Sequence, residues 1–513
     1  MISQTNSIGL WGIDGFGVTV ETVVRPTIGG FDIVGLADTA VREAKQRVQS
    51  AVVNSGFDIP DSGITVNLAP ADKKKEGSSY DLPILVTLMT ALGQIKNSGL
   101  VREKCFIGEL SLSGEVRGVN GVLCMCSAAK ELGYREIFVP SENAMEGSVV
   151  DGIDVYGVKS VQELVNHLNG VQELRPVKAD ATAFDFDDFK GLDFADVKGQ
   201  ARAKRALEIA AAGGHNILLI GPPGSGKSML AKRIPSILPK MNFDEAMTTT
   251  KIHSVAGLLQ ENASLVTTRP FRSPHHTMSP VSLSGGGRVP TPGEVSLAHN
   301  GVLFLDEFPE FGKSATEVLR QPIEDKQITI TRASGRLTYP CSFMLVCAMN
   351  PCKCGYYGHP TKQCNCRQRD INSYLSKISG PLLDRIDIQI EVSSLSYDEI
   401  SDKSKSESSL VIRERVNRAR ERAVKRYAND GFACNSNAEM TPAQIRKYCA
   451  LDEQGDAILR AAFDNLGMSA RAHDRILRLA RTIADLAESE SISANHVAEA
   501  VQMRSLDRKY WGR

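Results

Sequence analysis

The sequence predicts an α/β protein built around a phosphate-binding loop that joins a buried strand to a helix. The apolar run 216–220 is typical of a short core strand, and a helical run starts at Met229. The stretch between them, Gly-Pro-Pro-Gly-Ser-Gly-Lys-Ser, matches every defined position of the Walker A pattern. A second buried run, 302–305, ends in the carboxylate pair Asp306–Glu307, as the next motif of an ATPase does. The order of these motifs predicts an enzyme that hydrolyses ATP.

Each residue of the two motifs has a chemical reason. Glycines let backbone N–H groups converge on phosphate oxygens, the amine of Lys227 reaches the β and γ phosphates, and the Ser228 hydroxyl can ligand Mg²⁺. We expect Asp306 to hold Mg²⁺ through water and Glu307 to polarise the attacking water. A surface acidic pair after a core strand is the alternative, but it does not explain why both motifs occur in order. The predicted nucleotide-binding residues are Gly221, Pro222, Pro223, Gly224, Ser225, Gly226, Lys227 and Ser228.

Length and composition limit the remaining possibilities. A chain of 513 residues has room for roughly two to four domains. The formal net charge is zero, so any binding of nucleic acid must come from local basic patches. The start, 1–11, lacks the pattern of a secretory leader, and the longest apolar stretch, 82–92, is too short to span a bilayer. Eleven cysteines with a single cluster favour a reducing compartment, and we therefore expect a cytoplasmic protein without a membrane partner.

The first 170 residues alternate strand and helix patterns. Strands are expected at 17–24, 64–68 and 136–140, and helices at 41–53, 81–92 and 124–132. The loop Lys73-Lys74-Lys75 could contact a DNA backbone, although a solvated turn is an equal alternative.

Three stretches of this region resemble the N-terminal domain of the YifB/ComM family of magnesium-chelatase-like AAA+ proteins. They read VGLADTAVREAKQRVQSAVVNSGF, NLAPADKKKEGSSYDLPI and GELSLSGEVRGVNGVL, at 34–57, 67–84 and 108–123. The resemblance implies a domain similar in fold to the Lon protease domain, which uses a Ser/Lys dyad. Ser79 lies where the nucleophile would fall, but Met125 occupies the position of the lysine, and Lys130 lies beyond it. Without a base, a serine hydroxyl is a poor nucleophile, and we expect a non-catalytic accessory domain.

An acidic stretch, 171–193, reads as an exposed interdomain linker before the ATPase core. In AAA+ proteins the segment resembling DVKGQ, at 196–200, lines the adenine pocket, so Val197 and Gly199 are candidate nucleotide contacts. The proline- and glycine-rich stretch 269–301 is expected to form loops and resembles the helix-2 insertion of the family. Its His275 and His276 are a poor metal pair; a phosphate or subunit contact and a structural role both stay open.

Two strand patterns, 328–332 and 336–339, predict a hairpin around Ala-Ser-Gly. Its position resembles the pre-sensor hairpin of minichromosome maintenance helicases, whose basic tip grips DNA. Arg332 and Arg336 are therefore candidate DNA contacts, with an exposed hairpin face as the equal alternative.

The apolar strand 343–349 ends in Asn350, which places an amide near the γ-phosphate at the sensor-1 position. Two Cys-x-Cys pairs follow, and a tetrahedral Zn²⁺ site is favoured over four reduced surface thiols; His359 could replace one thiolate. The predicted zinc ligands are Cys352, Cys354, Cys364 and Cys366.

Two arginines complete the predicted catalytic set. Arg385, in Ser-Gly-Pro-Leu-Leu-Asp-Arg-Ile-Asp, resembles the AAA+ arginine finger, which reaches the γ-phosphate of a neighbouring subunit and so requires an oligomer. Arg471 matches the sensor-2 position, which contacts nucleotide across the helical lid. Helices are expected at 411–427, from 469 and at 493–503, and the basic residues of the first could add DNA affinity.

The expected fold class is α/β, with a Lon-protease-like α+β domain, a central AAA+ P-loop α/β core and a C-terminal helical lid domain. Their bounds are 1–170, a linker at 171–193, 194–392 and 393–513. The family resemblance implies a cytosolic hexameric motor that uses ATP and Mg²⁺ and acts on single-stranded or branched DNA. Branch migration in homologous recombination and natural transformation is the implied role. The alternatives are a magnesium-chelatase motor, whose adhesion-domain partner is absent from this chain, and an ATP-dependent protease, which Met125 disfavours.

Overall fold

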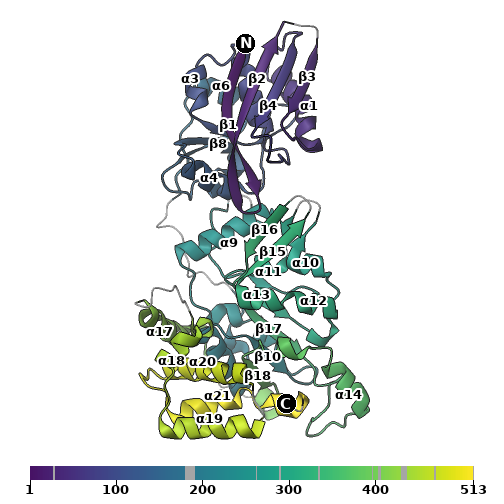
Figure 1. Ribbon diagram of the computed structural model, residues 1–513, viewed down its shortest axis with the longest axis vertical. Coiled ribbons are helices and arrows are strands. Elements are labelled where there is room, and N and C mark those ends of the chain that lie inside the picture. The colour runs from purple at the N-terminus through teal and green to yellow at the C-terminus, as the bar shows by residue number, and fades with distance from the viewer. Residues whose placement is uncertain are drawn as a thin grey trace. The chain divides into compact units, whose positions relative to one another are not determined.

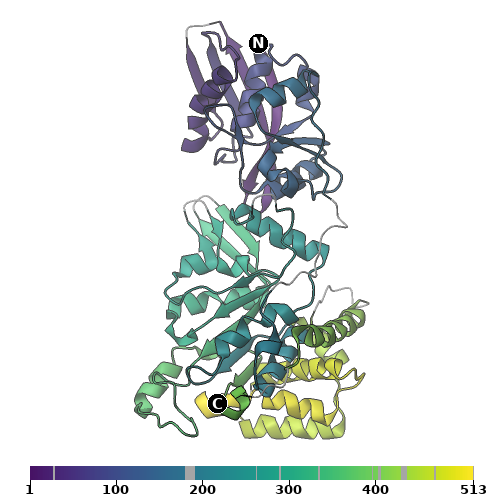
Figure 2. The ribbon, with the colours of Figure 1, turned by 180° about the vertical axis from the view of Figure 1, so that it is seen from behind.

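The computed structural model separates the chain into two compact units (Figures 1 and 2). It describes all residues except 27–28, 180–190, 261–262, 288–289, 333–334, 396, 402–405, 429–435, 467–468 and 512–513. Unit 1 comprises Met1–Asp185, Phe243–Thr267 and Pro290–Pro292, and unit 2 comprises Phe186–Asn242, Thr268–Val289 and Gly293–Arg513. Within the described parts, every helix is too short or too polar to cross a bilayer.

Unit 1 is built on a seven-stranded mixed sheet with the strand order β3-β4-β2-β1-β5-β8-β9. The pairs β1–β2 and β2–β4 are antiparallel, and the other neighbours run parallel. The strands are β1 (Ile2–Trp11), β2 (Asp14–Arg25), β3 (Gly30–Val34), β4 (Gly63–Ala69), β5 (Cys105–Phe106), β8 (Glu136–Pro140) and β9 (Asp154–Val158), beside a small pair, β6 (Glu109–Leu110) and β7 (Val116–Arg117). The three strands expected from the sequence are therefore confirmed.

The helices of unit 1 also follow the expected pattern. Helix α2 is apolar on all sides, and every one of its residues is buried. Its acidic residue, Asp81, is paired with Arg47, whose Nε lies 2.6 Å from the carboxylate. The helices are α1 (Thr39–Asn54), α2 (Asp81–Ala91), α3 (Ser98–Arg102), α4 (Val122–Glu131), α5 (Ala144–Gly147), α6 (Val161–Leu168) and α9 (Phe243–Val255).

Helix α9 belongs to unit 1 although the sequence places it among the ATPase motifs. It packs on α4, and the buried carboxylate of Glu146 accepts hydrogen bonds from the Ser254 hydroxyl and, at 2.9 Å, from the backbone N–H of Leu123. Met247 and Leu265 join the apolar cluster around α4. The expected core of 194–392 thus contributes two segments, Phe243–Thr267 and Pro290–Pro292, to the first unit.

The expected linker is only partly described, because 180–190 lie outside the described residues. Before that gap, Val177 forms an antiparallel bridge with Val155 and packs against the core of unit 1. After it, Asp193 accepts hydrogen bonds from the backbone N–H groups of Ala195 and Ser409. The described residues of 171–193 are exposed or half-buried, with hydrogen bonds at Val177 and Asp193, so the exposed interdomain linker stays a prediction.

Unit 2 contains an all-parallel five-stranded sheet with the order β11-β14-β17-β10-β18. Apolar residues fill its central strands, as expected when helices cover both faces of a parallel sheet. The strands are β10 (Ile217–Ile220), β11 (Phe271–Arg272), β14 (Val302–Leu305), β17 (Met344–Met349) and β18 (Ile388–Glu391), beside a hairpin of β15 (Gln327–Arg332) and β16 (Gly335–Pro340). Because the strands are parallel, every motif that follows a strand lies at the same edge.

The C-terminal part of unit 2 is helical, as expected. Residues of α7, α17, α20 and α21 share one apolar cluster with the sheet. The helices are α7 (Ala201–Gly213), α8 (Lys227–Ala231), α10 (Pro280–Ser284), α11 (Glu294–Leu297), α12 (Lys313–Val318), α13 (Arg320–Asp325), α14 (Gln368–Leu375), α15 (Gly380–Leu383), α16 (Tyr397–Ser401), α17 (Ser409–Tyr427), α18 (Pro442–Tyr448), α19 (Glu453–Leu466), α20 (Ala470–Leu486) and α21 (Ala494–Gln502). The insertion 269–301 is thus not all loop, because Leu283 of α10 and Val295 of α11 are buried.

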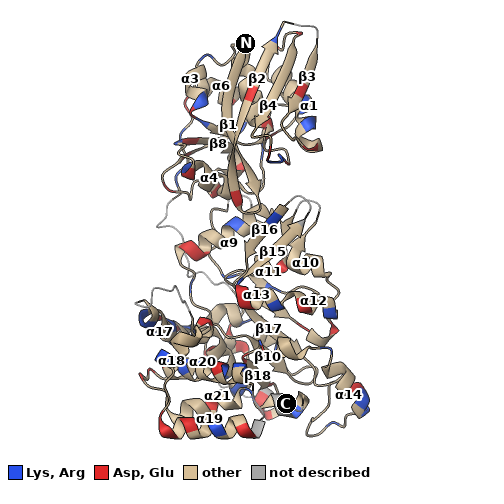
Figure 3. Cartoon of the chain, viewed as in Figure 1, with Lys and Arg blue, Asp and Glu red and all other residues tan. Residues whose placement is uncertain are grey.

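Helix α17 carries several basic residues, coloured blue in Figure 3, and three of its arginines pair with carboxylates of unit 2. Arg415 pairs with Glu208 and Glu407, Arg422 lies 2.7 Å from Glu490, and Arg426 pairs with Asp485. These contacts fix the helix on its neighbours, and a contribution of its basic residues to DNA binding stays a prediction.

Candidate functional site

The phosphate loop lies at the carboxyl edge of the sheet, between β10 and α8. Gly224 and Gly226 have φ angles of 77° and 89°, in the left-handed region that glycine adopts without a steric cost. Lys227 is buried, and its Nζ donates to the carbonyl oxygens of Gly221 at 2.8 Å and Pro222 at 2.9 Å. Burial lowers the pKa of Lys227 to about 8, with Asp306 opposing the shift. The loop therefore holds a poorly compensated cation where an anion would bind.

Residues from three strands meet around this lysine. The Ser228 hydroxyl donates to Asp306 Oδ2 at 2.6 Å, and Lys227 Nζ lies 3.2 Å from Oδ1 of Asn350. These side chains follow β10, β14 and β17, so the parallel sheet brings the three motifs together. Ser228 and Asp306 offer the oxygen ligands that Mg²⁺ prefers, and this edge of the sheet suits a Mg²⁺-bound nucleoside triphosphate.

Glu307 has an unusual backbone conformation and an unexpected neighbour. Its φ angle is 51°, which a non-glycine residue adopts only at a cost of roughly 1–3 kcal/mol. The side chain is 59% exposed, and its Oε2 lies 3.3 Å from Nδ1 of His276. His275 stacks beside His276, with ring centroids 4.2 Å apart. The roles of the two histidines stayed open in the sequence analysis. In the structure their partners differ, because His276 contacts Glu307 whereas His275 contacts Thr277.

The segment 196–200, predicted to line the adenine pocket, is held against the phosphate loop by Gln200, a residue that the sequence analysis did not single out. Val197 is buried, and Gly199 has a φ angle of 53°. Gln200, next in the chain, donates from Nε2 to the carbonyl oxygen of Ser225 at 3.2 Å and to that of Ser393 at 2.7 Å. The DVKGQ pattern included Gln200, but only the fold shows that its amide holds this segment on the loop.

The opposite, amino edge of the same sheet holds a second polar site, a pocket of about 630 Å³. It contains both predicted arginines, Arg385 and Arg471, beside residues that precede β10, β17 and β18. Four strand residues of β10 span about 13 Å, so neither arginine lies beside the phosphate loop of its own chain. Arg471 therefore does not lie beside the phosphate loop of its own chain, and its expected contact with nucleotide stays a prediction. The lining residues are Gly214, Asn216, Ile323, Glu324, Lys326, Ser342, Arg385, Asp387, Ala438, Glu439, Arg471, Asp474, Arg475 and Arg478.

Carboxylates balance the arginines of this pocket. Arg385 Nη2 lies 2.7 Å from Glu324, and its Nη1 donates to the carbonyl oxygen of Pro381 at 2.7 Å. Arg475 lies 3.4 Å from Asp387. Although burial alone would raise it, the pKa of Asp387 falls below its usual range because of His215, Arg475 and the backbone N–H of Asn216. Arg471, in contrast, is exposed at the pocket.

The four predicted zinc ligands form one cluster, all of their sulfur atoms lying within 4.8 Å of one another. Cys352 lies 3.3 Å from Cys354 and 3.7 Å from Cys364, and Cys354 lies 3.5 Å from Cys364. Burial raises the pKa of Cys354, but hydrogen bonds with the backbone of Tyr356, the Cys352 side chain, the backbone of Asn365 and the Cys364 side chain outweigh it and lower that pKa to about 6. His359 instead lies 3.3 Å from Ser394 through Nε2 and accepts backbone N–H groups through Nδ1.

Four sulfur ligands about 2.3 Å from a tetrahedral zinc ion would lie about 3.8 Å apart. The observed separations are close to that value and well above the length of a disulfide bond. The donor set therefore fits zinc without His359.

The predicted DNA contacts differ in their surroundings. Lys75 is fully buried and donates to the carbonyl oxygen of Pro70, which corrects its assignment as a DNA contact. Lys73 and Lys74 are exposed, and Lys74 pairs with Glu76. On the hairpin, alternate residues are buried, whereas Arg336 lies on the exposed face; the side chain of Arg332 lies outside the described residues.

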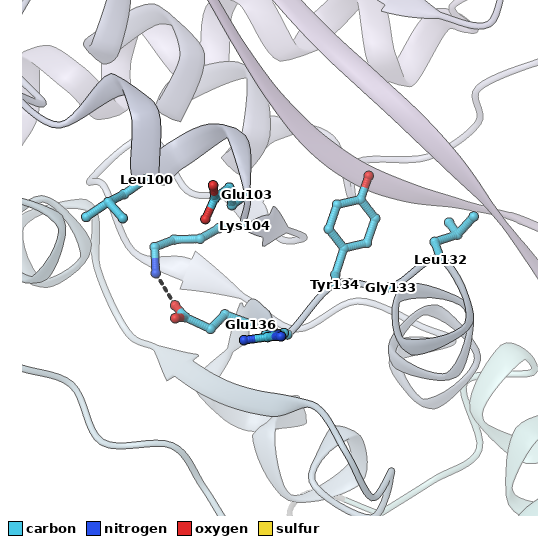
Figure 4. A pocket seen from close by; sticks show the side chains of 8 residues that line it. Leu100, Glu103, Lys104, Leu132, Gly133, Tyr134 and Glu136 are labelled. Atoms are coloured by element: carbon cyan, nitrogen blue, oxygen red, sulfur yellow. Dashed lines mark hydrogen bonds and ion pairs between the residues drawn. The ribbon is translucent and has the colours of Figure 1, made fainter.

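Unit 1 has a separate pocket of about 510 Å³, shown in Figure 4. Lys104 points to Glu136 across it, and the two side chains form an ion pair. Neither Ser79 nor Met125 lines this pocket, and both are buried elsewhere. Met125, on α4, has no titratable group to activate a serine.

Comparisons with known proteins cover almost the whole chain. The family models "Subunit ChlI of Mg-chelatase", "Magnesium chelatase, subunit ChlI" and "Magnesium chelatase, subunit ChlI C-terminal" match residues 20–143, 193–400 and 406–504. A 109-residue stretch is 27% identical to "Archaeal Lon protease" of Methanocaldococcus jannaschii, covering 21% of this chain and 16% of that protein.

Two full-length relatives are much more similar. "Uncharacterized protein YifB" of Salmonella typhimurium is 42% identical over 508 residues, which cover 97% of this chain and 96% of that protein. "Competence protein ComM" of Haemophilus influenzae is 41% identical over 497 residues, which cover 96% and 95%. With the phosphate-site motifs assembled at one edge of a parallel sheet, this chain belongs to the YifB/ComM family of magnesium-chelatase-like AAA+ ATPases.

Proposed function

We propose that this protein is a ring-shaped, ATP-driven motor that acts on DNA and catalyses branch migration during homologous recombination and natural transformation. The observation that carries the ring is the separation of the two sites in unit 2. Lys227 and Asp306 lie at one edge of the sheet, whereas Arg385 and Arg471 lie at the other. A head-to-tail contact between copies would bring one copy's arginines to the next copy's nucleotide, and such contacts form a ring when the rotation between copies closes. We propose six copies, as the family resemblance implies.

Hydrolysis would take place between two copies. Mg²⁺ held through Ser228 and Asp306 would neutralise charge on the β and γ phosphates. Lys227 would bind the same oxygens, and Glu307 would orient and polarise the attacking water. Asn350 is within hydrogen-bond distance of Lys227 and would position it. Arg385 and Arg471 of the neighbouring copy would stabilise the charge that develops on the γ-phosphate.

The proposed DNA contacts are Arg332 and Arg336 on the β15–β16 hairpin and Lys73 and Lys74 in unit 1. Ile328, Ile330, Leu337 and Tyr339 anchor the hairpin with one buried face, while Thr329 and Thr338 pair at 3.0 Å on the other. A rigid strand pair with an exposed polar face suits contact with the phosphate backbone. The name of the relative ComM supports DNA as the substrate.

We also propose that Cys352, Cys354, Cys364 and Cys366 hold one structural Zn²⁺, since their sulfur spacing matches a tetrahedral thiolate site. Metal analysis of the purified protein should give about one zinc ion per chain. A Cys354→Ser/Cys364→Ser variant should lose it, and intact thiols with only trace zinc would contradict the assignment.

The test of the motor is ATP hydrolysis with and without single-stranded and four-way-junction DNA, with Glu307→Gln as the inactive control. Stimulation by DNA that disappears in the variant supports the proposal, and strand exchange on the junction is then the next assay. Mass measurement with ATP and Glu307→Gln should show six copies. DNA-binding should weaken in Arg332→Ala/Arg336→Ala without loss of basal hydrolysis.

A magnesium-chelatase motor is the second candidate, because the family models carry that description. It predicts hydrolysis that is indifferent to DNA and that needs a separate porphyrin-binding partner. Unchanged hydrolysis in the presence of either DNA would favour this candidate over a DNA motor.

A further inference from the structure

The cysteine cluster lies in a loop that is joined to the ATP site at both ends. The loop runs from Cys352 to Cys366 and begins two residues after Asn350, whose amide contacts Lys227. It leads into α14, where the side chain of Tyr374 is hydrogen-bonded to the backbone of Asn350. A displacement of the loop would therefore act on the residue that positions Lys227.

A third contact joins the loop directly to the phosphate loop. Gly355, directly after Cys354, has a φ angle of 84°. A Cβ atom on Gly355 would lie 2.3 Å from Cδ and 2.7 Å from Cγ of Pro223, well inside van der Waals contact. The backbone of the cysteine loop thus packs against the proline of the phosphate loop, and only glycine fits this approach.

The loop has little else to fix its conformation. Between Lys353 and Arg367, a stretch that the structure describes in full, it contains no helix or strand, and Gly355 is its only buried residue there. A segment with so few buried contacts is held weakly by packing, and a metal ion that joins its two ends would supply the missing constraint.

We propose that zinc bound by the four cysteines positions the phosphate loop, so that nucleotide affinity depends on whether the metal is present. The metal would hold the segment around Gly355 against Pro223 and keep Asn350 beside Lys227. This inference rests on the proposed zinc site, and it adds a control of ATP binding by the metal. Gly355 is then a positioning residue for the ATP site.

Two glycines of the loop allow a matched test. Gly358 has a φ angle of 74°, close to that of Gly355, but a Cβ atom on Gly358 would meet only the tip of Lys509, at 3.7 Å and beyond. An alanine at either position meets similar backbone strain, whereas only Gly355→Ala collides with Pro223. The difference between the two variants isolates the contact with the phosphate loop from the strain in the cysteine loop.

The measurement is the affinity of the full-length protein for a fluorescent ADP analogue, with zinc content determined on each sample. Gly355→Ala should retain zinc and bind the analogue about tenfold or more weakly, because the added Cβ atom overpacks the contact with Pro223. Gly358→Ala should stay within about twofold. Removal of zinc from the natural protein by a chelator should weaken binding by at least about tenfold, and added zinc should restore it.

Equal affinity of the zinc-loaded and zinc-free protein would overturn the proposal, as would equal losses in the two glycine variants. Protein purified without zinc that binds the analogue tightly would also overturn it. Because the assay contains no DNA, failure of the DNA-motor proposal leaves its result unaffected.

Discussion

The two edges of the sheet in unit 2 carry their charges in opposite ways. At the carboxyl edge, Lys227 is buried among carbonyl oxygens, and its burial lowers its pKa to about 8. At the amino edge, Arg385 and Arg475 are paired with Glu324 and Asp387. Asp306 compensates the charge of Lys227 at the first edge only in part, whereas ion pairs largely balance the charges at the second. A phosphate group would relieve the first edge, whereas Arg385 must leave a carboxylate in order to reach one.

This difference teaches that catalytic residues predicted from one sequence need not act together within one copy of the protein. Asn216 shows how the fold separates the sites: its side chain donates to the carbonyl oxygen of Arg385 at 3.0 Å, and the strand that follows it ends at the phosphate loop. The same short strand thus starts beside the arginine and ends beside the lysine. In the proposed ring each copy would offer two half-sites, and the following predictions test whether these half-sites need each other.

The largest effect is expected from Arg385→Ala. An arginine supplied by a neighbour contributes about 10³-fold or more to phosphoryl transfer, so the maximal hydrolysis rate should fall by about that factor while ATP still binds. Lys227→Ala should instead lose nucleotide binding. The measurement is steady-state hydrolysis together with nucleotide affinity for each variant.

A mixture of these two inactive variants provides the control. The Arg385→Ala variant keeps an intact Lys227, and the Lys227→Ala variant keeps an intact Arg385. Where these two intact residues meet in one interface the site is complete, so mixed assemblies should regain part of the activity. Absence of any recovery, with mixed assembly demonstrated by mass measurement, would show that both residues act within one chain.

A smaller loss is expected from Arg471→Ala, because Arg471 shares the pocket with Arg385 and adds a second positive charge. Removing one such donor typically costs about 10²-fold in rate. Arg460→Ala is the matched control: Arg460 is also an exposed arginine of the C-terminal helices, but its recorded ion pair, with Asp456, lies outside the pocket. Recovery of Arg471→Ala upon mixing with Lys227→Ala would place its action between copies. Equal rates for the two arginine variants would remove Arg471 from the catalytic set.

Much of this site was predictable because its chemistry is local in sequence. The order of strand, glycine-rich loop and helix located Lys227, and the apolar runs before Asp306 and Asn350 located their strands. A parallel sheet then brings strand ends together by geometry alone. The hairpin and the cysteine cluster followed from equally local spacing. The same reasoning gave the helices α17, α20 and α21 from their periodicity.

Predictions failed where long-range packing decides. Lys75 looks like part of a basic loop, but the fold buries it against the carbonyl oxygen of Pro70. For Arg471 the sequence predicted the helix but not the edge of the sheet that it faces, because that edge depends on how the C-terminal domain packs. Helix α9 has no local signal that it joins unit 1, since Glu146 and Ser254 are 108 residues apart.

His276→Ala tests whether the contact between His276 and Glu307 changes the rate of basal ATP hydrolysis at the carboxyl edge of the sheet. An imidazole 3.3 Å from the carboxylate holds it in place and competes with the attacking water. Because an exposed pair of this kind contributes about 0.2–1 kcal/mol, its loss should raise basal hydrolysis without DNA by up to about fivefold. His275→Ala is the matched control, since its Nδ1 lies 2.9 Å from Thr277 instead. A lower rate in His276→Ala would show that the histidine assists Glu307.

The smallest effect is on stability, where the two edges should respond at opposite ends of the pH scale. The folded-state pKa of Lys227 lies below the unfolded value of about 10.4, so without nucleotide the unfolded chain binds more protons, and stability rises with pH from about 8 upward. The lowered pKa of Asp387 instead gives stability that is present above about pH 3.9 and is lost as the pH falls below it.

Urea unfolding can be followed at Trp511 in a Trp11→Phe background, since the chain has two tryptophans. Relative to Lys227→Met, the protein with the natural Lys227 should gain stability between pH 8 and 10. Relative to Asp387→Asn, the protein with the natural Asp387 should lose stability only in acid. Parallel pH curves for the natural residue and Lys227→Met would mean that the lysine charge is already compensated, and the contrast between the two edges would then disappear.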